Sequence, residues 1–406
     1  MKILHTSDWH LGKKLDDFPR IDEQRIVMKE ICEIAEQEQV DAVIVAGDLF
    51  DTFNPPAEAT ELFYKTLKKL SKDGQRPVIA IAGNHDSPDR IEAPDPLARE
   101  CGIIFAGFPN SMVNTMELES GIKIVKRDEG FVELSLPQYD YPLRVLLTPY
   151  ANEFRLRTFL GIDNSEEELR KILEESWQRI CKEHCNDDGV NILVSHLFVN
   201  KRGVPLEEDL DEEKPIMLGG AQVIYTENIP QEMQYTALGH LHRMQAVDGN
   251  KMVYYCGSPI SYSFSEANQK KYVLIVDVEP GQRAEVRQKE LINVRPVLRK
   301  RVHGMNEAIE WLRANPEALV ELTLVTKDYL TAEMRKTLSE EHSSIVQIIP
   351  EIENIEALKV KNDKDNLDLS KNIEELFIDY YRSVNKSEPA EDIMKLFNEV
   401  LAKNRN

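Results

Sequence analysis

Two histidines two positions apart, in the segment TALGHLHRMQ at residues 236–245, have a type and spacing that suit metal chemistry. The chain contains nine histidines in 406 residues. His240 and His242 follow a short apolar run that we expect to form a strand. Neutral imidazole is the commonest metal-binding side chain. Taken alone, the segment fits a solvent-exposed turn equally well, so other segments of the chain are needed to distinguish the two interpretations.

Potential ligands also follow four other apolar runs. SDWH, AGDLFD, GNHD and NILVSH contribute Asp8, His10, Asp48, Asn84, His85 and His196. Carboxylate, imidazole and amide groups together suit Mn²⁺, Fe²⁺ or Zn²⁺ rather than Ca²⁺. Even without His85, seven such residues are too many for one tetrahedral site and suit two adjacent ions that share a carboxylate. Two ions about 3.5–4 Å apart clamp a phosphate and activate a water for in-line attack.

These side chains need a scaffold that brings several strand ends together. KILHTSD, DAVIVAGD and PVIAIAGNHD are predicted strands, and residues 20–39 and 57–72 are predicted helices between them. Such alternation implies a partly parallel sheet with functional loops at the carboxyl ends of its strands. A predicted helix at about 165–184 precedes three more strand-like runs, NILVSH, QYTALGH and KMVYYCGSP. A four-layer α/β/β/α sandwich accommodates both halves.

The pattern changes near residue 271. KYVLIVDV and AEVRQKEL predict a β-hairpin around Glu279-Pro280-Gly281. VLRKRV, a helix at 305–314, ALVELTLVT, a helix at 331–341 and IVQIIPEI then predict a βαβαβ unit. The charged tail has apolar periodicity in IEELFIDYY and DIMKLFNEVLA. We therefore predict a main domain over 1–270, an α+β capping domain over 271–350, and a linker with a helical tail over 351–406.

Composition restricts the function classes. The length suffices for two or three domains, and no apolar run approaches the ~20 residues that span a bilayer. MKILHTSD turns polar after four residues, which predicts a core strand rather than a signal peptide. The formal charge of −21, from 71 acidic and 50 basic side chains, disfavours DNA binding by charge alone. It leaves open an enzyme that uses metal ions, local basic patches or a partner's basic surface.

The cysteines indicate the compartment. The chain has five cysteines, which suit free thiols in a reducing cytoplasm: Cys32, Cys101, Cys181, Cys185 and Cys256. Cys181, His184 and Cys185 lie within five residues and could form a metal clip. Because this segment has no second ligand pair nearby, we interpret it as the end of a helix.

The five ligand segments occur in the order Asp-x-His, Gly-Asp, Gly-Asn-His-Asp, His and Gly-His-x-His. This arrangement resembles the calcineurin-like metallophosphoesterase superfamily. SDWHLGK, AGDLFDTFNPP, GNHDSPDR and YCGSP resemble its SbcD family, the nuclease subunits of bacterial SbcCD complexes and counterparts of the MRN-complex nuclease. The resemblance implies one ion on Asp8, His10 and His242, a second on Asn84, His196 and His240, and Asp48 as the bridge. It also implies that His85 is the catalytic histidine.

The same resemblance implies an activity and partners. It implies a metal-dependent DNA nuclease, most simply with Mn²⁺, that acts as a double-strand exonuclease and a single-strand or hairpin endonuclease. The expected partners are an SbcC-like ABC-type ATPase, docked by the helical tail, and a second nuclease subunit, so that a homodimer lies within a heterotetramer. DNA ends and hairpins are the expected substrates, in DNA recombination, replication and repair.

Some residues near the motifs have two interpretations each. Asp51 stands where break-repair relatives carry a second histidine, and it either takes part in chemistry or caps a helix or braces a loop. Asp86 is a candidate to orient a histidine. His5 fits a core position better than a ligand, and Trp9 fits a wedge in the core better than a stacking platform for a base. Four basic residues are candidates for contacts with DNA phosphates or are ordinary exposed charges: Lys13, Lys14, Arg20 and Arg90.

Two rival functions remain open. A small-molecule phosphodiesterase or nucleotidase would use the same seven ligands, and the cap, the tail and the flanks of the motifs argue against it. A non-catalytic docking scaffold is disfavoured by the complete ligand set and by His85. For the tail, packing on the chain's own body is the alternative to docking on the ATPase.

Overall fold

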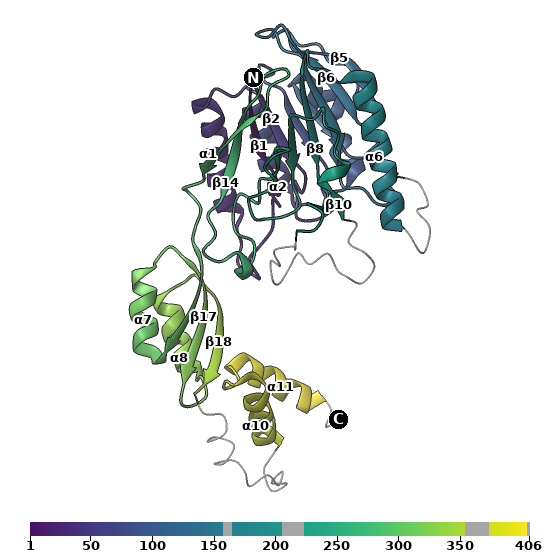
Figure 1. Cartoon of the computed structure of the whole chain (residues 1–406). Coiled ribbons are helices and arrows are strands. Elements are labelled where there is room, and N and C mark those ends of the chain that lie inside the picture. Colours follow the sequence, from purple (N-terminus) through teal and green to yellow (C-terminus); the bar gives the residue numbers. More distant parts are fainter. Residues whose placement is uncertain (157–164, 205–222, 354–372, 404–406) are drawn as a thin grey trace. The chain divides into compact units, whose positions relative to one another are not determined.

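The computed structural model describes residues 1–156, 165–204, 223–353 and 373–403. The chain forms two compact units, Met1–Val294 and Arg295–Asn406 (Figure 1). The first unit therefore extends beyond the boundary at residue 270 that the sequence predicted. The predicted hairpin causes the difference: its first strand, β14 (Tyr272–Asp277), pairs antiparallel with β1 (Lys2–Thr6) and so belongs to the first sheet.

The first sheet has six strands in the order β15-β14-β1-β2-β3-β4. The central strands are parallel, and helices connect them, because strands that pair in parallel need a long crossover connection. The additional elements of this layer are α1 (Ile21–Gln37), β2 (Ala42–Ala46), α2 (Ala57–Leu70), β3 (Val78–Ile81), α3 (Pro88–Glu92), α4 (Asp95–Glu100), β4 (Ile103–Ala106) and β15 (Glu285–Glu290).

The second sheet has seven strands in the order β12-β13-β11-β8-β7-β6-β5. Its parallel centre is β7, β8, β11 and β13, and β5, β6 and β12 are antiparallel to their neighbours. The elements are β5 (Lys123–Asp128), β6 (Phe131–Ser135), β7 (Leu143–Thr148), α5 (Glu153–Leu156), α6 (Ser165–His184), β8 (Val190–Ser195), β11 (Tyr235–Leu238), β12 (Gln245–Asp248) and β13 (Val253–Tyr255). A separate two-stranded ribbon joins β9 (Val199–Asn200) to β10 (Ile224–Tyr225).

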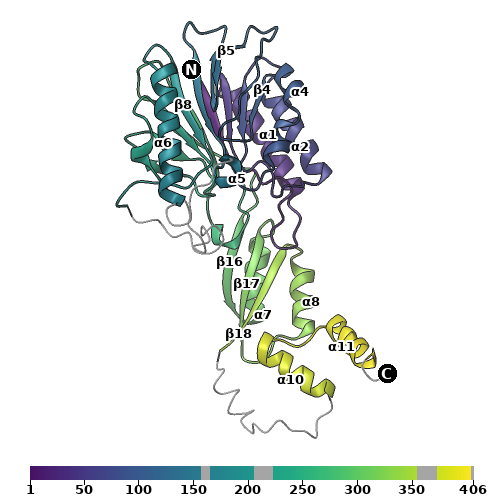
Figure 2. The same cartoon turned by 90° about the vertical axis from the view of Figure 1, so that its right-hand side faces the viewer.

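The two sheets face each other between outer helices, which confirms the predicted α/β/β/α sandwich (Figure 2). Ile44 and Ile79 of the first sheet and Val145 and Ile192 of the second share one buried core between the sheets. Phe63 of α2 packs on the outside of the first sheet, in a core that also contains residues of α1. Helix α6 packs on the outside of the second sheet.

The second unit contains the predicted βαβαβ arrangement. Its three strands are parallel in the order β16-β17-β18, and Leu312 and Leu338 of its helices pack on Leu322 and Leu324 of the central strand. The elements are β16 (Val297–His303), α7 (Gly304–Ala314), β17 (Leu319–Thr326), α8 (Ala332–Glu341) and β18 (Ile345–Ile352).

Two tail helices follow, α10 (Ile373–Asn385) and α11 (Glu391–Lys403), as the apolar periodicity predicted. Phe377 and Phe397 stack at 3.9 Å between ring centroids and join the helices. The main-chain N–H of Glu388 donates to the Leu330 carbonyl at 2.9 Å, so the tail also contacts the βαβαβ unit. None of the helices in the described ranges has the length and apolar character that crossing a membrane would need.

Candidate metal centre

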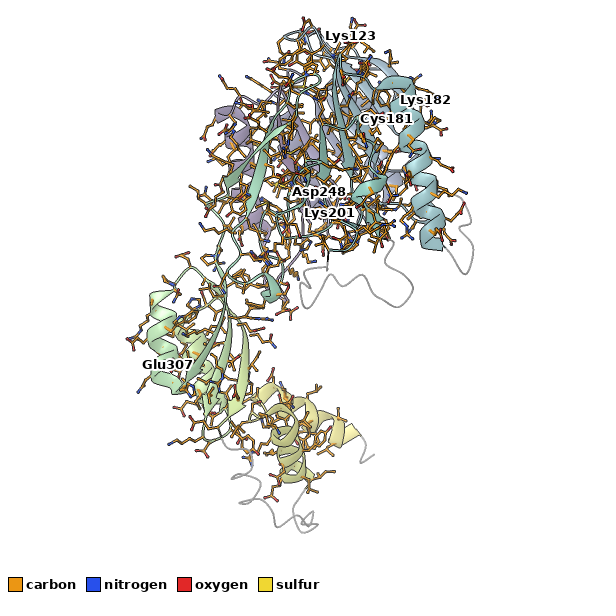
Figure 3. All side chains as sticks on the ribbon, viewed as in Figure 1. Lys123, Cys181, Lys182, Lys201, Asp248 and Glu307 are labelled. Atoms are coloured by element: carbon orange, nitrogen blue, oxygen red, sulfur yellow. The ribbon has the colours of Figure 1, made fainter. Side chains whose placement is uncertain are left out.

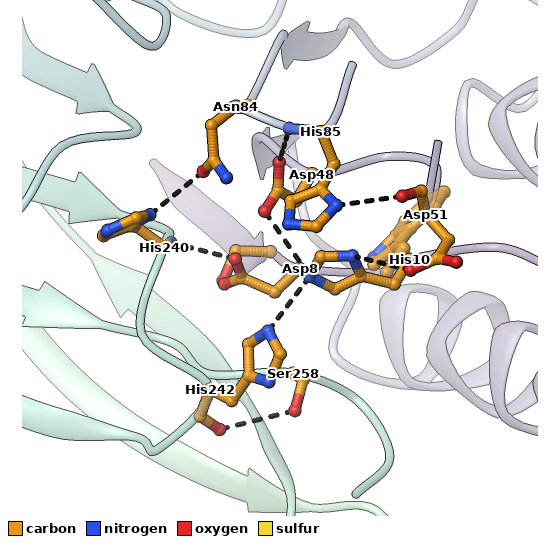
Figure 4. A network of polar contacts seen from close by, with 12 residues as sticks. Asp8, His10, Asp48, Asp51, Asn84, His85, His240, His242 and Ser258 are labelled. Atoms are coloured by element: carbon orange, nitrogen blue, oxygen red, sulfur yellow. Dashed lines mark hydrogen bonds and ion pairs between the residues drawn. The ribbon is translucent and has the colours of Figure 1, made fainter. Parts of the chain in front are cut away.

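The predicted ligands all lie just beyond the carboxyl ends of parallel strands. Asp8 and His10 follow β1, Asp48 follows β2, and Asn84 follows β3. The second sheet contributes His196 after β8, and His240 and His242 after β11. Hydrogen bonds cross between the sheets at this edge: the His240 N–H donates to Asp8 Oδ1 at 2.9 Å, and His196 Nδ1 bonds the Ala46 carbonyl at 2.8 Å. The structure thus brings all seven side chains to one place. Figure 4 labels Asp8, His10, Asp48, Asn84, His240 and His242 there.

The loops that carry these residues are strained. Four of the predicted ligands have a positive φ, which non-glycine residues rarely adopt: Asp8 (52°), His10 (40°), Asp48 (48°) and His240 (106°). Such conformations persist only where the surroundings impose them, and they concentrate at functional sites. The main-chain N–H groups of Asp8 and His10 donate to the Gly47 and Asp48 carbonyls at 2.9 Å each. The two loops therefore hold each other in the strained conformation.

One group of donor atoms surrounds His10 and His242. Their Nε2 atoms lie 2.9 Å apart, and His10 Nε2 is 3.4 Å from Asp48 Oδ2. Ligand atoms of Asp8, His10 and His242 lie within 4.8 Å of one another. Asp8 Oδ2 is buried without a hydrogen-bond partner among the described residues. A buried carboxylate oxygen is costly unless something positive meets it. The group therefore fits a cation.

A second group surrounds Asn84 and His196. His196 Nε2 lies 3.0 Å from Asn84 Oδ1 and 3.4 Å from Asp48 Oδ2, and His240 Nδ1 lies 3.1 Å from the same Asn84 oxygen. Because His196 Nδ1 donates to the Ala46 carbonyl, the ring would present the Nε2 lone pair to these two oxygens in its neutral form. A cation satisfies such a cluster of acceptors. Asp48 Oδ2 is 3.4 Å from an imidazole of each group, which is a bridging position.

The electrostatics fit the same interpretation. Burial raises the pKa of Asp8 to about 7, although His196 and His242 oppose this rise. Burial acts on Asp48 in the same direction, but His196 and His10 outweigh it and hold the pKa of Asp48 well below its usual value. Burial would lower the pKa of His196, yet Asp48 raises it to about 9. Positive charge beside Asp48 therefore stabilises its carboxylate, and a divalent ion could supply that charge in place of protonated histidine.

His85, the predicted catalytic histidine, lies beside His10, with 4.8 Å between the ring centroids. Its main-chain N–H donates to Asp48 Oδ1 at 2.9 Å, and its ring Nδ1 donates to the main-chain carbonyl of Asp51 at 2.9 Å. This leaves Nε2 available for another contact. Asp51 therefore braces the loop through its carbonyl, while its carboxylate lies 3.6 Å from Lys13 Nζ. The predicted alternative of a helix cap is wrong, because Pro56 occupies that position before α2.

Asp86 does not orient a histidine, contrary to the prediction. Its carboxylate accepts hydrogen bonds from the main-chain N–H groups of Gly83, Leu49 and Phe50 at 2.8, 3.0 and 2.9 Å. A carboxylate that accepts several main-chain bonds fixes the relative position of two loops. Asp86 therefore ties the loop of Asp48 to the loop of Asn84.

Arg155, which sequence reasoning missed, supports the same loop from the other side. Its guanidinium is buried and donates to the carbonyls of Gly83 and Asp86 at 2.8 Å each. It also lies over the ring of Tyr150. No motif or spacing marks Arg155, because its partners lie about seventy residues earlier in the chain.

The basic residues near the motifs differ in exposure. Arg20 is wrong as a DNA contact: it is 1% exposed, bonds Glu23 Oε2 at 2.6 Å and donates to the Ser261 carbonyl at 2.7 Å. The structure leaves Lys14 and Arg90 exposed and Lys13 half-buried. Arg90 donates to Asn54 Oδ1 at 2.8 Å. These three stay predictions.

The other candidates from the sequence lie outside the centre. His5 is buried, its Nδ1 lies 2.8 Å from the Tyr235 hydroxyl, and burial lowers the pKa of His5 to about 3. Trp9 is buried with its ring edge against Phe63, as the wedge interpretation predicted.

The segment around Cys181 forms the end of α6, as predicted, and Figure 3 labels Cys181 on this helix. Both cysteines pack with the core beneath the helix. His184 instead stacks on Phe131 and contacts Asp128 at 3.3 Å. Its candidate metal-binding neighbours are Asp128 and Glu183 rather than the two cysteines.

Comparison with known proteins identifies relatives of this chain. The family model described as calcineurin-like phosphoesterase matches residues 1–244. The SbcD subunit of the SbcCD nuclease from Bacillus subtilis is 35% identical over 409 residues, covering 98% of this chain and 97% of that protein. The protein of the same name from Escherichia coli K12 is 30% identical and covers 86% of this chain and 84% of its own.

Solved structures include a dimetal phosphatase from Danio rerio, which is 11% identical. It covers 72% of this chain and 96% of its own, with a TM-score of 0.38.

Proposed function

This chain belongs to the calcineurin-like phosphoesterase family and to its SbcD nuclease subunits, and from that membership we propose that it hydrolyses DNA phosphodiester bonds with two metal ions. The observation that carries the two-metal proposal is the position of Asp48. Its Oδ2 lies 3.4 Å from Nε2 of both His10 and His196, and each imidazole belongs to a separate group of donors.

In this proposal, each residue of the site has a defined role. Asp8, His10 and His242 hold one ion, Asn84, His196 and His240 hold the other, and Asp48 is shared. Bound ions of this kind activate a water and neutralise charge on the phosphate. The donors suit Mn²⁺, Fe²⁺ or Zn²⁺, and family membership selects Mn²⁺ as the ion we propose. His85 directs Nε2 at the scissile phosphate or the departing sugar oxygen, since Nδ1 is occupied by the Asp51 carbonyl.

A cleavage assay distinguishes the nuclease from its rivals. Metal-depleted protein is incubated with Mn²⁺ and, in parallel, with double-stranded DNA ends, hairpin DNA or a nucleoside cyclic phosphate. We expect cleavage of both DNA substrates, which corresponds to exonuclease and endonuclease activity, and little turnover of the cyclic phosphate. Turnover of the cyclic phosphate alone would favour a small-molecule phosphodiesterase. Absence of cleavage with both ions bound would favour a docking scaffold.

We propose that the tail docks on an SbcC-like ABC-type ATPase. The stacked pair Phe377 and Phe397 accounts for part of the apolar surface of α10 and α11. Other apolar side chains on the two helices stay largely exposed: Ile373, Tyr380, Val384, Leu396 and Val400. Short helices gain stability by burying such a face against a partner, and a coiled coil offers a matching apolar groove.

Truncation after about residue 370 tests the docking role. We expect the shortened chain to keep Mn²⁺-dependent cleavage and to lose co-purification with the ATPase. The double substitution Tyr380→Ser and Leu396→Ser provides a milder variant that leaves the stacked pair in place. Undiminished binding of the ATPase by both variants would contradict docking through the tail.

The remaining proposals concern assembly and setting. By family membership we propose a homodimer of this chain within a heterotetramer, which the mass of the reconstituted complex measures. We also propose a cytoplasmic location and a role in DNA recombination, replication and repair. Free thiols support the location: the described residues include Cys32, Cys101, Cys181, Cys185 and Cys256 without a disulfide.

A further inference from the structure

A polar cluster that contacts His242 at Nδ1 is buried from solvent. Glu266, at the end of a short 3-10 helix (Phe264–Glu266), is 5% exposed, and Lys271, just before β14, is 4% exposed. Glu266 Oε1 lies 3.2 Å from His242 Nδ1 and accepts the N–H of Tyr262 at 2.9 Å.

The other oxygen of this carboxylate is also fully engaged. Glu266 Oε2 accepts from Ser258 Oγ at 3.2 Å and forms an ion pair with Lys271 Nζ. Lys271 Nζ in turn donates to Ser258 Oγ at 3.0 Å and to the His242 carbonyl at 3.1 Å. Figure 4 shows Ser258 bonded to His242. These contacts therefore hold Glu266 in place, with one carboxylate oxygen directed at the imidazole of His242.

An ionised carboxylate only accepts hydrogen bonds, so it places the single proton of a neutral imidazole on the nitrogen that faces it. For His242 that nitrogen is Nδ1, and the Nε2 lone pair then faces His10 Nε2 at 2.9 Å and the donor group around Asp8. His196 achieves the same result with the Ala46 carbonyl, a main-chain atom. His242, one of two histidines at its proposed metal position, is thus oriented by a replaceable side chain, whereas His196 at the other position is oriented by a main-chain atom.

We propose that Glu266 is a positioning residue that fixes the tautomer and ring orientation of His242, and so sets the affinity of one of the two metal positions. Lys271 and Ser258 hold Glu266 in place. This inference rests on the proposed two-metal function. A buried ion pair by itself is a weak source of stability, since apolar residues of similar volume often replace one without loss. The contact with His242 gives this pair a role that an apolar pair could not perform.

The test compares metal binding by three proteins. Glu266→Gln alone would leave the buried Lys271 charge uncompensated and would threaten folding. The double variant Glu266→Gln with Lys271→Met removes both charges together. Its matched control is Glu290→Gln with Lys270→Met, which removes an exposed pair with a 2.9 Å contact close by in the chain. Mn²⁺ titration calorimetry and elemental analysis of metal-depleted, reloaded protein measure each affinity and the ions bound per chain.

We expect wild type and the control to bind two ions. Loss of an orienting partner of this kind typically lowers metal affinity about 10–100-fold. The double variant should therefore show that loss at one position and an unchanged affinity at the other. Side-chain nitrogen NMR of Zn²⁺-loaded, histidine-labelled protein should show protonated Nδ1 at His242 in wild type and a changed signal in the variant. If the role of Glu266 is purely structural, neither the metal affinity of one position nor the Nδ1 signal of His242 should change selectively.

The outcomes separate the inference from the function it rests on. Two ions bound by wild type and by the double variant with equal affinities would overturn the role of Glu266 and leave the two-metal proposal standing. Equal weakening at both positions would also overturn it. Fewer than two ions on wild type would contradict the two-metal proposal itself. If the double variant does not fold, Glu266→Asp retains the charge and withdraws the carboxylate, and unchanged affinity there would equally refute the inference.

Discussion

Replacing His85 by glutamine separates catalysis from metal binding. The main-chain N–H of His85 donates to Asp48 Oδ1, and this bond survives any change of side chain. Glutamine has an amide that can still donate to the Asp51 carbonyl. The ring of His85 is not needed to complete either group of donors. We therefore expect His85→Gln to keep both ions, DNA binding and the ATPase partner.

The expected loss is in the rate of cleavage. Since Nδ1 is engaged with the Asp51 carbonyl, the group removed is Nε2. A hydrogen bond to charge that develops on the phosphate, or a proton given to the leaving oxygen, is worth about 10²–10⁴ in rate. This range corresponds to roughly 2.7–5.4 kcal/mol of transition-state stabilisation. His85 is half-buried, so water competes for the same contacts and favours the lower end. We expect at least a ~10²-fold decrease.

Single-turnover cleavage of hairpin DNA in saturating Mn²⁺ measures this effect, with bound Mn²⁺ determined on the same samples. His303→Gln, an exposed histidine of the second unit, is the matched control and should behave as wild type. If His85 only buttresses the loop, the variant will bind Mn²⁺ weakly and excess Mn²⁺ will restore the rate. Near-normal cleavage at full occupancy would refute the catalytic role.

Two further substitutions address the bridge and the core. Asp48→Ala should abolish cleavage and lower bound metal well below two ions per chain while the circular dichroism spectrum is retained, and two ions on this variant would contradict the bridge. His5, with its pKa lowered to about 3, stays neutral in the fold, whereas the unfolded chain binds a proton below about 6.5. The free energy of unfolding should therefore fall as pH drops from about 6.5 towards 3, by about 1.4 kcal/mol per unit from this group. In urea unfolding at several pH values, His5→Gln should lose that part of the slope, and an unchanged slope would argue against a neutral His5.

Most of the fold follows from local periodicity, and the errors lie where pairing is distant. The βαβ repeats of the first sheet and the βαβαβ unit were predicted because each strand and helix carries its own apolar pattern. Strands β5, β6 and β7 were not predicted, because their runs are short and interrupted by charged residues such as Lys126, Glu133 and Arg144. The hairpin was predicted as a hairpin but assigned to the wrong unit, since its pairing with β1 joins residues about 270 positions apart.

The same distinction between local and distant information applies to the candidate site. That the proposed ligands lie together could be predicted because parallel strands place their carboxyl ends at one edge, so position in the chain translates into position in space. Supporting residues have no such rule. Arg20 looked like an exposed cation and is buried, while Glu266, in the unremarkable segment SFSEAN, contacts a ligand 24 residues earlier. Which way a loop side chain faces depends on tertiary packing that one sequence does not reveal.

The charge of the chain determines how a nuclease of this kind must hold DNA. With a net charge of −21, the surface repels phosphates at long range. One cation near the site is also partly neutralised, because Lys13 Nζ lies 3.6 Å from Asp51 Oδ1. Elsewhere in the first unit, Lys201 Nζ lies 3.2 Å from Asp248 Oδ2, and Figure 3 labels both residues. The proposed ions therefore provide much of the positive charge that meets the scissile phosphate, and Asp48 and Asp8 hold that charge in place. In the complex proposed above, the ATPase partner would supply the affinity for the rest of the duplex that this acidic chain lacks.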